Sequence, residues 1–184
     1  MEYISLGGDC AVAYQLQKFG LRKQSYPFDW ILSPRLNKII QDECKYMWDE
    51  SYLIFKNKSN SFPKINEHWD STLHSTIRVV HSHYHITYLH DISTDEEKSL
   101  EVIKAREKYE KRINRFHTIM KDPSILKKCF RMAKFEPLQE WFINLGYKNV
   151  YIYQHESVSG TDWKRNEWDW ESWFNSKPNF VIEK

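Results

Sequence analysis

The chain has 184 residues, and its 27 Lys and Arg residues nearly balance its 25 Asp and Glu residues, for a net charge of +2. That balance argues against nucleic acid or a membrane surface as a partner, since both call for a dominant basic patch. No run approaches the ~20 apolar residues of a membrane-spanning helix, and no secretory signal is recognisable at the start. Three widely spaced cysteines fit free thiols in a reducing compartment. We therefore expect one soluble, cytoplasmic domain over residues 1–184.

The first predicted elements are a short strand and a helix joined by a glycine turn. Residues 3–6 are β-prone, Gly7 and Gly8 interrupt them, and Asp9 is a typical N-cap residue. Apolar residues then recur at helical spacing up to Gly20, which is placed to end the helix.

Strands and helices alternate through the rest of the chain. Apolar residues at helical spacing over 35–48 predict a helical insertion after the first strand–helix unit. A strand follows within 76–89, and Thr94 with Glu97 forms a capping box that opens a helix to about residue 120. The remaining elements are a strand at 128–132, a helix at 137–146 and a strand at 149–153. This order predicts a three-layer α/β fold, a mostly parallel sheet with helices on both faces.

The glycine turn is the first candidate site, because sites in parallel α/β sheets form outside the carboxyl ends of the strands. Backbone N–H groups at Gly7, Gly8 and Asp9 are placed to bind an anion or an oxyanion. Cys10 follows at the positive end of the helix dipole, which favours a thiolate nucleophile. The neighbouring Asp9 carboxylate opposes this by raising the thiol pKa. The alternative is that Cys10 is a small buried residue where a helix meets the sheet.

Two histidines are candidates for the general base. His90 ends the strand predicted within 76–89 and precedes Asp91, while His155 follows the strand at 149–153. Asp91 orients His90 only if the chain has already turned, because neighbouring strand residues face opposite sides. For His90 the alternative is a partly exposed surface position at the end of a strand.

Two further charged residues are candidates for supporting roles. Asp29 lies in an aromatic loop that could bury it, so that it orients a histidine or a substrate amine. Equally, Asp29 could cap a helix that begins near Pro34. Arg131 lies inside an apolar strand and needs a carboxylate partner, for which Asp29 and Asp9 are the candidates.

We expect no metal and no cofactor. His81, His83 and His85 would share one face of a strand, the spacing that a zinc site uses. However, no carboxylate or cysteine completes the ligand set at the usual spacing. An exposed polar strand face is the better interpretation.

Two segments near the start carry a family resemblance. They are Ile-Ser-Leu-Gly-Gly-Asp-Cys-Ala-Val-Ala-Tyr-Gln-Leu at 4–16 and Ser-Tyr-Pro-Phe-Asp-Trp at 25–30. They resemble the DUF1796 family of papain-like cysteine peptidases, and the resemblance continues more weakly through His90-Asp91, 112–116 and Phe130-Arg131. The resemblance implies that Cys10 is the nucleophile, that His90 is its partner and that the substrate is a peptide.

The predicted element order leaves other functions open. A strand precedes Cys10, unlike the layout of papain, and strand–Gly-Asp–nucleophile is similar to the first block of the SGNH esterases with Cys in place of Ser. The late Asp-x-x-His of those enzymes is not found near the end of this sequence. The hypotheses are a cysteine peptidase, an esterase or acyltransferase that takes an ester or another acyl substrate, and a non-catalytic module that binds an anionic ligand and a partner.

Overall fold

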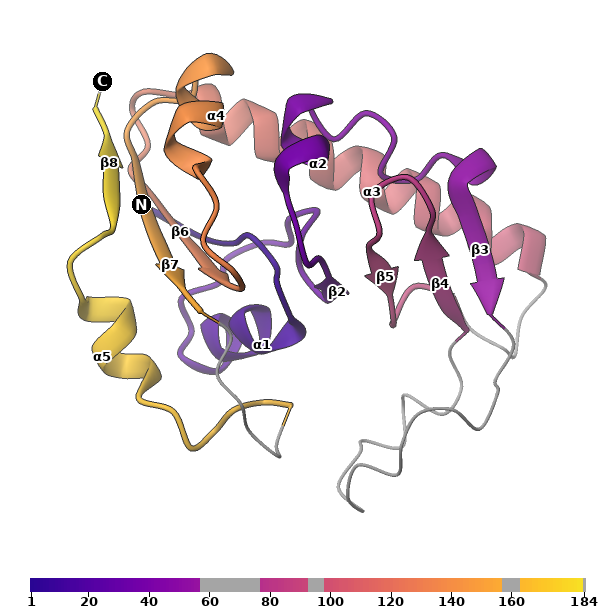
Figure 1. Ribbon diagram of the computed structural model, residues 1–184, viewed down its shortest axis with the longest axis horizontal. Helices are drawn as coiled ribbons and strands as arrows, with labels where there is room; N and C mark the ends of the chain where they lie inside the picture. Colours follow the sequence, from indigo (N-terminus) through magenta and orange to yellow (C-terminus); the bar gives the residue numbers. More distant parts are fainter. Residues whose placement is uncertain (57–76, 93–97, 157–162, 184) are drawn as a thin grey trace.

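The computed structural model describes residues 1–56, 77–92, 98–156 and 163–183. Its described residues form a mixed α/β fold with two four-stranded sheets, A and B (Figure 1). Sheet A contains, in spatial order, β1 (Glu2–Ser5), β6 (Lys127–Met132), β7 (Val150–His155) and β8 (Phe180–Ile182). The strands β1, β6 and β7 are parallel, and β8 joins β7 antiparallel. The mostly parallel sheet predicted from the sequence is thus sheet A.

Sheet B is antiparallel and was not predicted. It contains, in spatial order, β2 (Ile31–Leu32), β5 (Thr87–Tyr88), β4 (Arg78–His81) and β3 (Leu53–Lys56). Strands of two to four residues are too short to show an alternating pattern in the sequence. The insertion expected to be helical contains only the short helix α2 (Asn37–Gln41) and the 3₁₀ turn Glu50–Tyr52 beside these strands.

The strand predicted within 76–89 is a hairpin of β4 and β5. β4 ends at His81, and His83 and His85 lie after it, His85 with a positive φ of 55°. The expectation that His81, His83 and His85 share one strand face was therefore wrong. The sequence did not reveal this turn, because its left-handed position, where Gly or Asn is usual, is occupied by His85.

Side chains of β6 alternate between two cores that cover sheet A. Phe130 and Met132 pack with the helices α1 (Cys10–Lys18) and α5 (Trp170–Asn175). Cys129 packs with α3 (Lys98–Lys121) and α4 (Leu138–Asn144). This alternation is the period of 2 expected of a strand buried on both sides.

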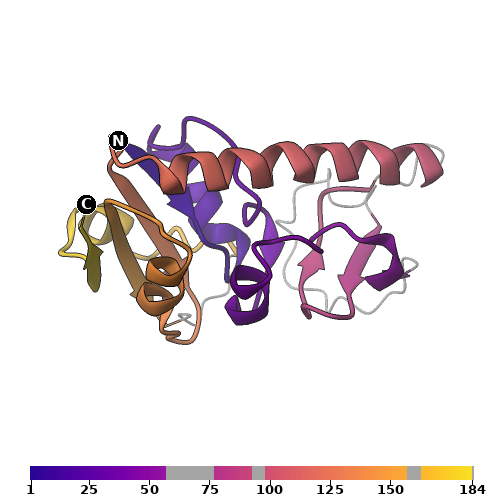
Figure 2. The same cartoon turned by 90° about the horizontal axis from the view of Figure 1, so that it is seen from above.

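The long helix α3 runs along both sheets (Figure 2). Its inward residues Tyr109 and Phe116 belong to one core together with Tyr88 of sheet B and Ile152 of sheet A. The capping box predicted at Thr94 and Glu97 lies outside the described residues. Within the described part of the chain, no helix combines the length and the apolar character needed to cross a bilayer.

Candidate active site

The glycine turn brings the end of β1 against the end of β6. Gly7 and Gly8 have positive φ values of 69° and 100°, and a Cβ on Gly8 would collide with the Met132 carbonyl group. Only glycine fits such a position without strain. Asp9 then caps α1, with its carboxylate accepting the Ala11 N–H at 2.9 Å, as predicted. Cys10 is the first residue of the helix.

The two strands that meet at this turn lead to different cores. β1 continues into α1, which packs with α5, whereas β6 continues into α4, which packs with α3. Neighbouring parallel strands whose connections leave toward opposite faces open a crevice at their carboxyl ends, where α/β proteins usually bind ligands. Cys10 opens α1 at this switch point of sheet A.

The backbone donors of the turn are partly in use. The Gly7 N–H donates to Ser5 Oγ at 3.2 Å, and the Gly8 N–H donates to Ser33 Oγ at 3.0 Å. Among the described residues, no acceptor faces the N–H groups of Asp9 and Cys10. The donors that remain for an anion are therefore those at the helix start, one or two residues beyond the glycines.

The Cys10 thiol is in a setting that favours its protonated form. Cys10 is 6% exposed, and burial raises the pKa of its thiol. The negative charges of Asp9, Asp91 and Asp29 raise this pKa further, which places all three carboxyl groups within electrostatic range of the sulfur. A base is therefore needed to make this sulfur a nucleophile at neutral pH.

Asp29 is buried beneath the aromatic loop, as one of the two sequence interpretations required. Its side chain is 1% exposed, and its Oδ2 pairs with Arg22 at 2.7 Å and accepts the Tyr26 N–H at 2.9 Å. Its Oδ1 has no hydrogen-bond partner in the described part of the chain. Sequence analysis did not identify Arg22 as the partner of Asp29. An arginine seven residues before a carboxylate forms no recognisable sequence pattern.

His90 and Asp91 come from the loop that follows β5. The His90 ring meets the Trp30 ring edge-on, with centroids 5.7 Å apart, and Trp30 immediately follows Asp29. Asp91 is fixed by α3, where Lys108 Nζ lies 2.5 Å from Oδ1 and the Tyr109 hydroxyl donates to Oδ2 at 3.0 Å. The structure thus brings Asp29 and Asp91 to the surroundings of Cys10 and His90 to the loop that holds Asp29.

His155 lies at the end of β7 on the side of the C-terminal tryptophans. Its ring packs on Trp168 and Trp173, with centroid distances of 4.8 and 6.3 Å. Its Nδ1 donates to the Glu156 carbonyl at 2.8 Å. These contacts describe a histidine held in an aromatic corner next to the sheet.

The partner of Arg131 is Glu136, at 2.8 Å, so the expectation of Asp29 or Asp9 was wrong. Arg131 is fully buried and also donates to the carbonyl groups of Leu6 and Ser33. Glu136 lies only five residues along the chain, beyond the end of β6 and the bend at 133–134. Arg131 therefore ties β6 to the segments that follow β1 and β2.

Asp9 has a partner that sequence analysis missed. Arg165 Nε and Nη2 lie 3.2 and 3.1 Å from Asp9 Oδ2. The two residues are 156 positions apart, and no sequence pattern links them. The C-terminal segment therefore reaches the start of α1, directly beside Cys10.

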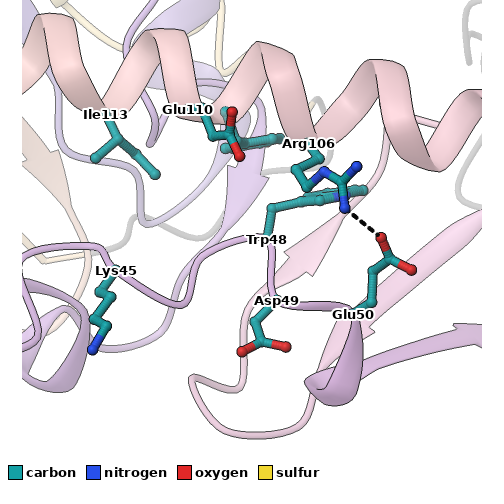
Figure 3. A pocket seen from close by; sticks show the side chains of 8 residues that line it. Lys45, Trp48, Asp49, Glu50, Arg106, Glu110 and Ile113 are labelled. Carbon is teal, nitrogen blue, oxygen red and sulfur yellow. Dashed lines mark hydrogen bonds and ion pairs between the residues drawn. The ribbon is translucent and has the colours of Figure 1, made fainter.

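A cavity of about 500 Å³ lies elsewhere, between α3 and the segment 45–50 (Figure 3). Its lining combines Trp48, Tyr109 and Ile113 with charged side chains of both signs, among which Arg106 and Glu50 pair at 3.2 Å. None of the residues predicted for the site lines it. Tyr109 is the link between the two regions, since its ring lines the cavity and its hydroxyl group holds Asp91.

His81, the last residue of β4, and His83 just after it have protein partners. His81 Nδ1 accepts the Tyr84 N–H at 3.1 Å, and its Nε2 donates to the Tyr46 carbonyl at 2.7 Å. His83 lies 3.5 Å from Asp42 and stacks on Tyr52. Within the described ranges, His, Cys, Asp and Glu side chains form no group of three or more that could hold a metal ion.

Comparisons with known proteins find similarity over the first three quarters of the chain. The model of the family described as "Putative papain-like cysteine peptidase (DUF1796)" matches residues 1–140. An uncharacterized protein of Acanthamoeba polyphaga mimivirus is 32% identical over 141 residues, which cover 73% of this chain and 62% of the viral protein. This chain therefore spans less than two thirds of that relative. No solved structure shows significant similarity to the present chain. Cys10, Asp29, His90, Asp91 and Arg131 lie within the matched residues, and His155 and Arg165 lie outside them.

Proposed function

The chain belongs to the DUF1796 family, and on that premise we propose that it is a thiol-dependent hydrolase that cleaves a peptide or isopeptide bond with Cys10 as its nucleophile. The observation that carries the proposal is the position of Cys10. It opens α1 just after the carboxyl end of β1, within electrostatic range of Asp29 and Asp91, whereas the other two thiols lie at no helix start. Cys44 and Cys129 are fully buried in the core.

His90 is the proposed general base. The raised pKa of the Cys10 thiol requires that a base remove its proton as the sulfur attacks the carbonyl carbon. The protonated imidazole then gives this proton to the leaving amine as the C–N bond breaks, and a thioester to Cys10 remains. Water then attacks the thioester carbon as His90 takes a proton from it, and His90 returns this proton to the Cys10 sulfur as the C–S bond breaks and the acid leaves. In this proposal the His90 ring swings from the Trp30 edge toward Cys10 to serve both steps.

The oxyanion donors proposed for this reaction are the N–H groups of Cys10 and Asp9. Those of Gly7 and Gly8 already donate to serine hydroxyl groups and shape the turn instead. Donors at a helix start are fixed before the reaction begins, so they stabilise the developing charge without reorganisation.

An ester or thioester substrate is the second candidate. It is favoured by the course of the chain, in which a strand of a mostly parallel sheet leads through Gly-Gly-Asp to the nucleophile at a helix start. This resembles the first block of the SGNH esterases more than it resembles papain. The thioester intermediate and the roles of Cys10 and His90 are the same for both substrate classes, so a panel of substrates separates them.

A thioester trap tests the proposal. The protein is mixed with a fluorogenic peptide mixture, an isopeptide and a p-nitrophenyl ester, and the acyl adduct on each cysteine is mapped by mass spectrometry. We expect an adduct on Cys10 that disappears in Cys10→Ser and forms at least about 100-fold more slowly in His90→Asn, the scale of a lost general base. Release of amine or alcohol should follow the same order.

His155→Asn is the matched control, since His155 also ends a strand of sheet A. It should leave the acylation rate within about threefold of the unchanged protein. Loss of acylation in His155→Asn with retention in His90→Asn would reassign the base. Absence of an adduct on Cys10 with every substrate class would instead favour the non-catalytic module, for which the 6% exposure of Cys10 is the supporting observation.

A further inference from the structure

Residues 163–166, here called the strap, cross the outer side of α1. The Gln15 amide donates to the Lys164 carbonyl at 2.6 Å, and Asn166 Oδ1 accepts from both Gln15 and Lys18. The Trp163 ring meets Tyr14 edge-on, with centroids 5.4 Å apart. The strap thus contacts the C-terminal half of α1.

Cys10 is on the side of α1 that the strap covers. With 100° per residue, Cys10, Tyr14 and Lys18 form one stripe, whereas Val12 and Leu16 lie on the opposite side and pack in the core formed with β6. Cys10 is nevertheless only 6% exposed, while Lys18 of the same stripe is exposed. The strap holds Asp9, the residue before Cys10, and Tyr14, one turn after it on the same stripe, so the strap lies beside the thiol.

The strap is fastened next to Cys10 by the Asp9–Arg165 pair. This pair is partly exposed, with 19% and 15% of the two side chains accessible. Arg165 holds a left-handed backbone with φ of 50°, a conformation that non-glycine residues adopt at a cost. In addition, Gln15 Oε1 and Trp163 Nε1 are buried without a hydrogen-bond partner among the described residues. The docked strap therefore carries costs that its release removes.

We propose that the strap is a gate over Cys10, that the Asp9–Arg165 pair is its latch, and that release of the strap exposes the thiol to substrate. The biological meaning of the gate rests on the proposed function, because a gate regulates only a reactive thiol. The strap lies beyond residues 1–140, so the gate belongs to this chain and not to the segment that the family model matches.

Alkylation rates of the three thiols test the gate. Folded protein is treated with iodoacetamide at fixed pH, and the labelling of Cys10, Cys44 and Cys129 is followed by peptide mass mapping. We expect Arg165→Gln to label Cys10 at least about fivefold faster than the unchanged protein, because labelling follows the population of the open state. Cys44 and Cys129, both 0% exposed, should stay unlabelled and report that the fold is intact.

Trp163→Ala releases the strap without removing a charge near the sulfur, and it should also accelerate Cys10 labelling selectively. Lys177→Gln is the control, since Lys177 is an exposed cation of the same C-terminal segment, and it should leave the rate unchanged. Arg165→Lys should retain part of the latch and give an intermediate rate.

An unchanged or slower Cys10 in both Arg165→Gln and Trp163→Ala overturns the gate. Labelling of all three thiols in both variants also overturns it, because the strap would then be part of what keeps the whole domain folded. The proposed function fails separately. Unchanged protein that forms no acyl adduct, with variants that gain Cys10 labelling, would leave a gated thiol without hydrolase activity.

Discussion

Sheets A and B differ in how they are built and in what they contribute to the Cys10 region. Sheet A has three parallel strands of four to six residues, of which β1 leads to α1 and β6 leads to α4. Sheet B is antiparallel, and its strands have two to four residues. Cys10 follows a strand of sheet A, whereas Asp29 precedes and His90 follows strands of sheet B.

The difference teaches that the candidate site is a joint between two sheets. Sheet A fixes the sulfur through the backbone, because Gly8 approaches β6 too closely for any side chain. Sheet B offers its groups through loops, where the Asp29 loop ends at Trp30 and His90 meets the Trp30 ring. A backbone-fixed Cys10 beside groups carried on loops supports the proposed mechanism, in which the base moves while the nucleophile stays.

The largest loss of stability is expected at Gly8, where the close contact with sheet A leaves no room for a side chain. Gly8→Ala forces a Cβ into the Met132 carbonyl group at a φ of 100°, and we expect it to lower the free energy of unfolding by about 4 kcal/mol. Gly146→Ala is the matched control, because Gly146 has a φ of 69° but no atom within 4 Å of an added Cβ. It should cost only about 1 kcal/mol, the strain of the left-handed backbone. Urea unfolding measures both, and equal costs would show that close contact with β6 does not matter.

This contrast also explains how much the sequence could predict. The helix at Cys10, the strands at 128–132 and 149–153 and the helix at 137–146 were predicted close to their observed positions, because each buries a repeating apolar face next to a local cap or turn residue. Sheet B escaped because its pairing is set by partners far apart in the chain. Local patterns carry no information on such pairing.

The site shows the same division. The N-cap role of Asp9 and the burial of Asp29 follow from neighbouring residues, and the sequence indicated the first and offered the second as one of two equal interpretations. Asp9 with Arg165 could not be foreseen, since charge pairs across 156 residues depend on the final fold. Arg131 shows a different limit, because its need for a carboxylate was clear but the choice of Glu136 depended on the turn after β6.

The second largest loss of stability is expected for a change at Glu136. It pairs with the fully buried Arg131 at 2.8 Å and accepts the Leu36 N–H, which links β6 to the segment between β2 and α2. Glu136→Gln leaves a buried guanidinium without a counter-charge, and we expect a loss of about 3 kcal/mol in unfolding free energy. Glu140→Gln, at an exposed position of α4, should change it by less than about 0.5 kcal/mol. A small effect of Glu136→Gln would mean that carbonyl acceptors alone satisfy Arg131.

A smaller loss of stability is expected for a change at Asp29, in the loop that precedes β2 of sheet B. Asp29→Asn removes the charge that holds Arg22 and weakens the bond to the Tyr26 N–H, at a cost of about 2 kcal/mol. Glu50→Gln, from the pair with Arg106 that is about half exposed, should cost no more than about 0.5 kcal/mol because solvent screens it. Thermal unfolding of the two variants gives the comparison. Asp29→Asn should also slow acylation of Cys10, while Glu50→Gln should not.

The smallest expected effect concerns the titration of the sulfur itself. Burial and three nearby carboxylates raise the pKa of the Cys10 thiol, so its alkylation rate should climb about tenfold per pH unit from pH 7 to 10 without levelling off. In urea the same thiol should level off near its ordinary pKa of about 8.5. Because the pKa is raised in the folded state, the thiol's contribution to stability is complete below that value and is lost as the pH rises above it. By pH 9 this amounts to about 1 kcal/mol, which Cys10→Ala should remove from the pH dependence of unfolding. A rate that levels off near pH 8 in the folded protein would show instead that the helix start and a nearby base outweigh burial, and that sheet A presents a thiolate ready to react.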